Sequence, residues 1–530
     1  ATTGTVYLDA IGAIDDSQGA TDLYIAAGTL YLNSDAATDT TARTAVTTLN
    51  SDLSGGSGAL VINEDSGITL ATIATANANV TVTDTGGDII VGSVNAGSGT
   101  VALTASSGSI YDDGDAGVDI TAATGTANLN ANGVIGTGGN DLETTVANLV
   151  VNTGTGNAVM TETDDLVVSG ASSVAGNLVL GLNAGNLTQS NTLAVTGTTQ
   201  ITTTGSITLN NAGNDFGGAV STAGNPTTVT LRDANAIQLG GITTTGGGGG
   251  TAIDVATVNG GITVGNTLDA SGAATAAVSL VAAGQDSDVT VNAAVTTDTA
   301  DITITADDSV SIAAATTLST GAGVAGDIVV TANNATTAGD SGDQVTMAAD
   351  SVLEAGGAVA TGVVTVTANG ANAGSVALGD LRGSAVTVSA DQAAITDAGA
   401  GATNVTTAGT FTADSASGIG TSVNPIETTI ATLDAQVTGA GGVYVTETDD
   451  VTVTQAQTGN GDVTLVSSGG SLTVDTVVTD TTNDVVTLTA ANAIVDGNGA
   501  TNNVTAFRLN ATADSGIGSG DAIETAVGEL

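Results

Sequence analysis

The stretch DITITADDSVSIAA, residues 301–314, contains two short runs in which apolar and polar residues alternate, and an acidic turn joins them. Alternation of β-branched with polar residues is typical of strands that bury one face. Runs of this kind recur roughly every ten to thirteen residues, separated by clusters of Gly, Asn, Asp or Ser. Such clusters favour turns, because they tolerate positive φ or hydrogen-bond their own backbone. Since no stretch has helical periodicity, the sequence predicts an all-β protein.

Composition distinguishes the two all-β architectures that have short, regularly spaced strands. The chain of 530 residues contains 75 glycines, 2% aromatic residues, and neither Trp nor Cys. A β-sandwich normally fills the space between its two sheets with larger side chains. A parallel β-solenoid needs less bulk, because each coil stacks on the next around a narrow column of small aliphatic residues. The composition therefore favours a parallel β-helix, and the repeat described below indicates about 19–25 residues per coil.

The charged residues exclude several classes of function. Four arginines and no lysine stand against 53 acidic residues, which gives a net charge of −49, and there is no His. This charge repels nucleic acid and anionic lipid, and no segment approaches the ~20 apolar residues of a membrane helix. Without Cys or His, the chain lacks thiolate nucleophiles, zinc-thiolate sites and the usual general base. We therefore expect no nucleic-acid partner, no membrane insertion and no enzymatic activity.

A long internal repeat indicates a quasi-one-dimensional architecture. The segment ETTVANL at residues 143–149 matches ETTIATL at 427–433 and ETAVGEL at 524–530, and RTAVTTL at 43–49 is a more distant copy. A GVIG or GIG signal precedes three of these copies. Their spacing gives a period of about 96 residues. We therefore expect one continuous solenoid of about five and a half units, with approximate bounds 1–97, 98–193, 194–288, 289–382, 383–480 and, for the partial unit, 481–530.

Both ends of the sequence fall inside this repeat pattern. Residue 1 is not an initiator Met, and Leu530 aligns with Leu149 and Leu433 in the middle of a unit. A natural solenoid usually ends in an atypical polar cap. We therefore expect a fragment of a longer chain, whose partners are a continuation of the same chain or like subunits stacked end to end.

Two longer segments resemble the repeats of a known family. SITLNNAGNDFGGAVS at residues 206–221, followed by VTLRDANAIQLGGI at 229–242, resembles the repeats of filamentous-haemagglutinin-type giant surface adhesins of bacteria. The unit that combines GIG, the ET segment and ETDD is similar to repeats of the same proteins, so the resemblance covers most of the chain. It implies a right-handed parallel β-helix that is exported to the cell surface and serves as an adhesin stalk or fibre. It carries over no catalytic residue.

Acidic turns supply the local chemistry of this sequence. The motif TETDD occurs at residues 161–165 and again at 446–450, and YDDGD at 111–115 is a further acidic turn. Ca²⁺ accepts about six to eight oxygen ligands in flexible geometry, so such turns could bind it. The alternative is a solvated turn that only keeps the surface charged. The candidate metal ligands are Glu162, Asp164, Asp165, Glu447, Asp449 and Asp450.

Two functions are compatible with these features. The first is a structural section of an extracellular or cell-surface fibre or stalk, without catalytic activity and without a cofactor other than Ca²⁺. The second is an adhesin that binds a receptor or a glycan, on a host or a neighbouring cell, through loops on the solenoid. A large exposed apolar or aromatic patch would favour adhesion, whereas a uniformly polar surface would favour a fibre.

Overall fold

The computed structural model describes residues 3–15, 24–246, 250–321, 326–332, 343–356, 361–369, 374–399 and 401–529. The regular elements in these ranges are β-strands, with no helix that could cross a membrane. Strands from successive coils pair in parallel. The chain divides into two units, residues 1–240 and 241–530. The prediction of an all-β parallel solenoid is confirmed.

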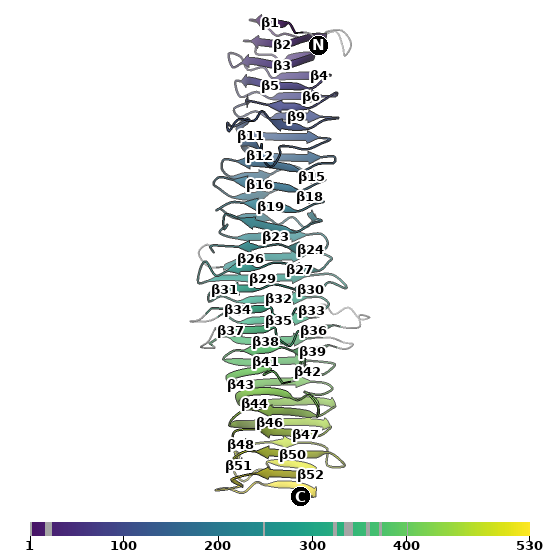
Figure 1. Ribbon diagram of the computed structural model, residues 1–530, viewed down its shortest axis with the longest axis vertical. Helices are drawn as coiled ribbons and strands as arrows, with labels where there is room; N and C mark the ends of the chain where they lie inside the picture. Colours follow the sequence, from purple (N-terminus) through teal and green to yellow (C-terminus); the bar gives the residue numbers. More distant parts are fainter. Residues whose placement is uncertain are drawn as a thin grey trace. The chain divides into compact units, whose positions relative to one another are not determined.

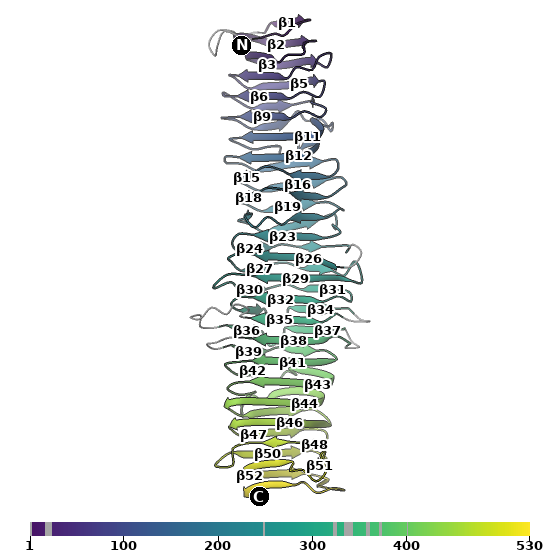
Figure 2. The ribbon, with the colours of Figure 1, turned by 180° about the vertical axis from the view of Figure 1, so that it is seen from behind.

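In the first unit, each regular coil consists of three strands that lie on three sheets. Through residues 158–209, each strand pairs with the strand three places later in the chain, at an offset of 20–22 residues, as in Ala158 with Leu178 and Leu166 with Leu187. Figure 1 shows these strands stacked layer on layer, and Figure 2 shows the same stack from behind. Two successive coils are formed by β13 (Ala158–Glu162), β14 (Leu166–Val168), β15 (Ser172–Val174), β16 (Leu178–Leu182), β17 (Leu187–Gln189) and β18 (Leu193–Val195).

The second unit repeats this three-sheet arrangement. The stretch 301–314 forms two strands on different sheets, as its alternation predicts. Ile302 lies opposite Val278 and Val310 opposite Val289, so coils here have 24 and 21 residues. These coils are formed by β29 (Ala276–Ala282), β30 (Val289–Val291), β31 (Val295–Thr297), β32 (Ile302–Ala306), β33 (Val310–Ile312) and β34 (Thr317–Thr320).

Several coils of the second unit are longer than the predicted range, with offsets of 27 residues from Ile262 to Val289 and 31 from Gln344 to Ser375. Ile328 in β35 (Ile328–Ala332) pairs with Val364 in β38 (Val363–Ala368), an offset of 36 residues. The ladders before and after this pairing keep their register. Coil length is therefore constrained where strands pair, whereas the connections accept insertions, because a longer surface loop adds little closure entropy.

The core of each unit is a column of small aliphatic side chains. Strand residues alternate between buried and partly exposed positions, so one face of each strand packs inward. The largest fully buried side chains are two phenylalanines, followed by leucines and isoleucines. One of them, Phe411 of β43 (Val405–Ser415), lies in register between Val386 and Leu433 of the neighbouring coils. Burying each such side chain contributes about 1.5–3 kcal/mol, and the coil-on-coil stack buries one at every second strand position.

The repeated GVIG and GIG signals have a structural reason. Their last glycine is left-handed in all three copies, with φ of 61° at Gly136, 62° at Gly420 and 64° at Gly518. Its N–H donates to an isoleucine carbonyl of the preceding coil at 2.8–2.9 Å in each copy. Glycine adopts this backbone without the strain that a Cβ would bring. The repeated segments therefore share a turn as well as a sequence.

Candidate metal centre

The two TETDD turns lie in different units but have the same local structure. Each contributes one buried glutamate, Glu162 at the end of β13 and Glu447 at the end of β45 (Val443–Glu447). The Glu162 carboxylate accepts hydrogen bonds from the Thr144 hydroxyl at 2.6 Å and from the Val146 N–H at 3.1 Å. The Glu447 carboxylate accepts the corresponding bonds from the Thr428 hydroxyl and the Ile430 N–H.

These glutamates satisfy backbone groups at a corner of the coil. Val146 lies in β12 (Leu142–Thr153), opposite the turn between β13 and β14, where the ladder to the next coil is interrupted. Its N–H would therefore be buried without a partner if Glu162 were absent, and such a group costs about 1–3 kcal/mol. Glu64 makes the same bonds to the Thr44 hydroxyl and the Val46 N–H in an earlier repeat. We call these three residues the corner glutamates.

Burial and hydrogen bonding act in opposite directions on the pKa values of Glu162 and Glu447. Burial raises the pKa of Glu162 to about 7, although bonds from Thr144, Thr163 and Val146 lower it. Burial likewise raises the pKa of Glu447, against the hydrogen bonds that it accepts. The desolvation of the charged form thus exceeds the stabilisation by the donors.

The aspartates of the TETDD turns lie on the surface. Asp165 accepts the Asn186 N–H and Asp450 accepts the Ser471 N–H, both at 2.6 Å, and both donors belong to the next coil. Asp164 and Asp449 are exposed. In neither turn do three carboxylate oxygens converge within 4.8 Å among the residues that the structure describes. A Ca²⁺ site at these six residues stays a prediction, and the glutamates already have donors around their oxygens.

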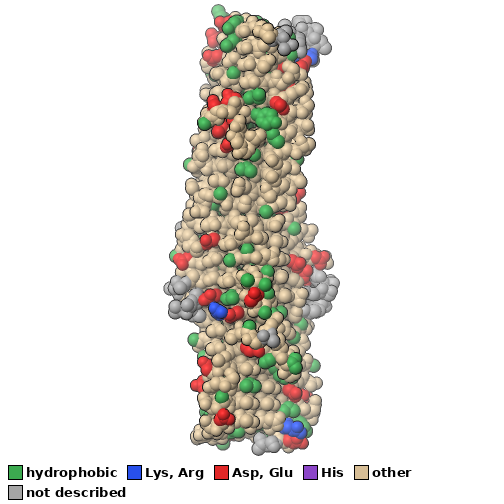
Figure 3. All heavy atoms as spheres, in the orientation of Figure 1, with side chains coloured by type: hydrophobic (Ala, Val, Ile, Leu, Met, Phe, Trp, Pro, Cys, Tyr) green, Lys and Arg blue, Asp and Glu red, His purple; other side chains and the backbone are tan. Residues whose placement is uncertain are grey.

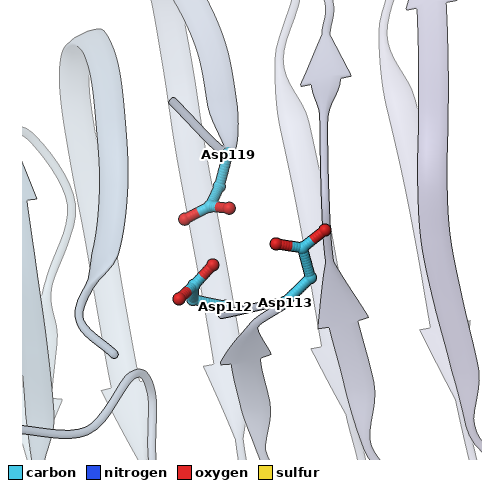
Figure 4. Close-up of side chains that lie close together, drawn as sticks. All are labelled: Asp112, Asp113 and Asp119. Carbon is cyan, nitrogen blue, oxygen red and sulfur yellow. The ribbon is translucent and has the colours of Figure 1, made fainter. Parts of the chain in front are cut away.

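A different acidic cluster brings three carboxylates together in the first unit. One oxygen each of Asp112, Asp113 and Asp119 lies within 4.8 Å of the other two. Asp112 ends β10 (Ile110–Asp112), and Asp119 directly precedes β11 (Ile120–Ala131), so a six-residue loop joins them around a corner of the coil. Figure 4 shows the carboxylates of Asp112 and Asp119 facing each other, with Asp113 beside them. We call these three residues the aspartate corner.

The aspartate corner contains buried oxygens without hydrogen-bond partners. Asp112 is 6% exposed and Asp119 is fully buried. Both carboxylate oxygens of Asp112 and Oδ1 of Asp119 lack a partner, whereas Oδ2 of Asp119 accepts the Glu143 N–H at 2.8 Å. Oε2 of Glu143, on the next coil, is also buried and without a partner. At this corner, carboxylate oxygens of Asp112 and Asp119, which can only accept hydrogen bonds when charged, face each other without a donor between them.

The electrostatics of the corner follow from this geometry. Burial raises the pKa of Asp119 to about 9, and the charges of Asp112 and Glu143 add to the increase, while the Glu143 N–H opposes it. Burial also raises the pKa of Glu143. Two buried carboxylates at such a distance cannot both stay charged without compensation. The corner therefore requires a proton or a cation.

Sequence reasoning identified part of this cluster. The acidic turn YDDGD contains Asp112 and Asp113, but Asp119 follows only after a loop, and no spacing rule for metal ligands connects it to them. A usable signal was present in the repeats. Asparagine occupies the position of Asp119 in two other copies, at Asn404 and Asn503, so Asp119 is a local exception.

Comparison with known proteins adds one similarity. The family model described as "Repeats of unknown function (DUF5649)" matches residues 155–223. This range covers regular coils of the first unit, from β13 to β22 (Val220–Ala223), and does not include the aspartate corner. No curated protein and no solved structure matches the chain. The coils are thus those of a repeat protein with similarity to repeats whose function is unknown.

Proposed function

We propose that this chain is a structural, non-catalytic section of an extracellular or cell-surface fibre or stalk. The observation that carries the proposal is the parallel ladder between successive coils within each unit, such as the five-residue register from Ala158 with Leu178 to Glu162 with Leu182. Each coil adds about 4.8 Å along its stack. A chain that uses most of its length in this way spans distance, and its neighbours in the stack are always the adjacent coils.

The hydrogen bonds between successive coils support a role in resisting tension along the stack. Three parallel ladders hold each regular coil to the next, so extension along the stack would have to break many backbone hydrogen bonds together. Polar side chains add bonds in the same direction, for example from the Asn177 N–H to Oδ1 of Asn157 and from the Thr198 N–H to Oδ1 of Asn177. Such side-chain ladders reinforce the turns, which would otherwise contribute little to the stability of the stack.

The surface favours the fibre over the adhesin. Among the described residues, the large apolar side chains that are exposed lie at separate places along the sequence, and only the first two are close together: Tyr7, Ile11, Val118, Val258, Val423 and Ile517. On the face drawn in Figure 3, apolar side chains form small, separate spots among the backbone and the other side chains. Protein-binding surfaces more often present a contiguous apolar patch. This distribution supports a spacer whose sides stay soluble.

Imaging of the native assembly tests the proposal. Antibodies raised against the folded chain, labelled with gold and viewed by electron microscopy on intact cells, should mark extended material outside the cell. Labelling spread along a filament or stalk is the expected result. Labelling confined to the cell interior would contradict the proposal, and labelling restricted to a tip, together with glycan binding by the isolated chain, would favour the adhesin.

A further inference from the structure

The aspartate corner has counterparts in two other repeats, which serve as internal references. In each copy an aspartate is followed seven residues later by the position of Asp119, whose main-chain N–H donates to a glutamate carbonyl of the next coil at 2.8–3.0 Å. The side chain at that position accepts the N–H of the same glutamate, at 2.8–3.0 Å. The hydrogen bonds that join this position to the next coil are therefore the same in all three. The matching sets are Asp112, Asp119 and Glu143; Asp397, Asn404 and Glu427; and Asp496, Asn503 and Glu524.

At the position of Asp119, the side chain differs between the copies in one atom. In the reference copies, the asparagine amide donates to the facing aspartate, at 2.8 Å from Asn404 to Asp397 and at 2.7 Å from Asn503 to Asp496. Asp119 has an oxygen where these residues have the amide nitrogen. Asp397 and Asp496 also accept the N–H of the residue two places later, from Gly399 and Asn498. Asp112 receives neither bond, and both of its oxygens are buried without a partner.

We propose that Asp112, Asp113 and Asp119 bind a divalent cation, Ca²⁺, that replaces the missing amide donor. Carboxylate oxygens are hard ligands, and no nitrogen or sulfur ligand is available in a chain without His or Cys. Asp113, which is absent from the reference copies, adds a third carboxylate on the solvent side. Ca²⁺ tolerates such an irregular, partly open shell, and water can complete its roughly six to eight ligands, whereas Mg²⁺ demands an octahedron.

The cation would fasten the corner between two sheets of one coil. Asp112 ends one strand, and Asp119 directly precedes the next. The Asp119 carbonyl accepts the Val94 N–H of the preceding coil, and its N–H donates to the Glu143 carbonyl of the next coil. A bound ion therefore closes the loop 113–118 at its base and neutralises the charge beside Glu143 of the next coil. The expected affinity is that of extracellular calcium modules, about 10⁻⁴–10⁻³ M. This inference does not rest on the proposed function.

The test compares Asp119→Asn with the wild-type chain. The substitution recreates the reference corners, keeps the acceptor for the Glu143 N–H and supplies a donor to Asp112. Melting temperatures are measured with chelator, with millimolar Ca²⁺ and with equimolar Mg²⁺. Asp450→Asn is the matched control, because it removes one charge from a TETDD turn.

Terbium, excited through the neighbouring Tyr111, reports binding directly, and Tyr111→Phe should abolish that luminescence without affecting the calcium response.

The expected result has three parts. Ca²⁺ raises the wild-type melting temperature by about 2 °C or more, and Mg²⁺ raises it less. Asp450→Asn keeps this response, whereas Asp119→Asn loses it and binds terbium at least about tenfold more weakly. In chelator, Asp119→Asn melts above the wild type, because its corner is neutral and hydrogen-bonded.

Three outcomes would overturn the proposal: no calcium response in the wild type, equal responses to Ca²⁺ and Mg²⁺, or a response that Asp119→Asn retains. The first would mean that a shared proton compensates the corner. A response lost only in Asp450→Asn would also overturn it and would favour the TETDD turn. If Asp119→Asn does not fold, Asp113→Asn, at an exposed position, provides the same comparison.

Discussion

Replacing Glu162 by Gln tests whether burial outweighs hydrogen bonding at a corner glutamate. Glu162 is fully buried, and its pKa rises from an ordinary value of 4.5 to about 7 in the folded chain. The folded state therefore holds a proton that the unfolded state releases, so the stability contributed by this group is present at low pH and is lost as pH rises from 4.5 to 7. Between pH 5 and pH 8 the loss amounts to about 2.5 kcal/mol.

The measurement is the difference in unfolding free energy between wild type and Glu162→Gln, from urea denaturation at several pH values. Gln cannot ionise, so the variant lacks this dependence, and the background from the other 52 acidic residues, of 53 in all, largely cancels in the difference. The range from pH 5 to pH 8 stays above the pI of about 4.1. The wild type should lose about 2.5 kcal/mol relative to the variant across this range. Hydrogen exchange at the Val146 amide provides a local readout of the same corner.

Asp52→Asn is the matched control for this experiment. Asp52 is exposed, and hydrogen bonds from the hydroxyl and N–H of Ser54 lower its pKa below 3.8. A lowered pKa contributes stability that is lost only at pH values below this range, so the difference for Asp52→Asn should stay flat. A flat difference for Glu162→Gln would refute the reasoning. A difference of opposite sign would show that the donors around Glu162 outweigh its desolvation.

Further substitutions test the core and the turns. Phe411→Ala should cost about 3–5 kcal/mol of unfolding free energy, because the fully buried ring leaves a cavity between coils; a loss below about 1 kcal/mol in urea denaturation would mean that the coils close over it. Gly420→Ala should cost about 1–3 kcal/mol, because φ is 62° and the new Cβ would lie 2.6 Å from the Tyr444 carbonyl oxygen. Gly138→Ala, with no atom within 4 Å, should change stability by less than about 0.5 kcal/mol. Equal losses at the two glycines would rule out the left-handed backbone as the cause.

The fold could be predicted because its signals are local and repeated. The alternation in residues 301–314 directly marks β32 and β33, since side chains on a strand point to opposite faces in turn. Parallel stacking could be predicted because the sequence has few of the large residues that fill the core of a β-sandwich. The offset of 36 residues between Ile328 and Val364 was outside the expected range, because loop insertions leave the strand pattern unchanged.

The candidate site could be predicted only in part. Acidic motifs marked Glu162 and Asp164 as equivalent ligands, yet they differ in environment: Glu162 is buried and Asp164 is exposed. The end of the strand decides this difference, because Glu162 is the last residue of β13 and Asp164 lies in the turn that follows. Alternation alone would place both side chains on the same face. The partners of Glu162, Thr144 and Val146, lie 18 and 16 residues earlier in the chain. They become neighbours only when one coil is set in register on the next.

By itself, the sequence determined that this protein is an all-β stack of small-residue coils, because strand periodicity, turn residues and side-chain volume are properties of short segments. The tertiary structure alone decided which carboxylates meet and whether they have donors. Asp112 and Asp119 face each other because a loop returns the chain around a corner of the coil, and the asparagine that compensates this geometry elsewhere is an aspartate here. Charge compensation depends on distances between oxygen atoms, and those distances arise only when the coils are closed and stacked.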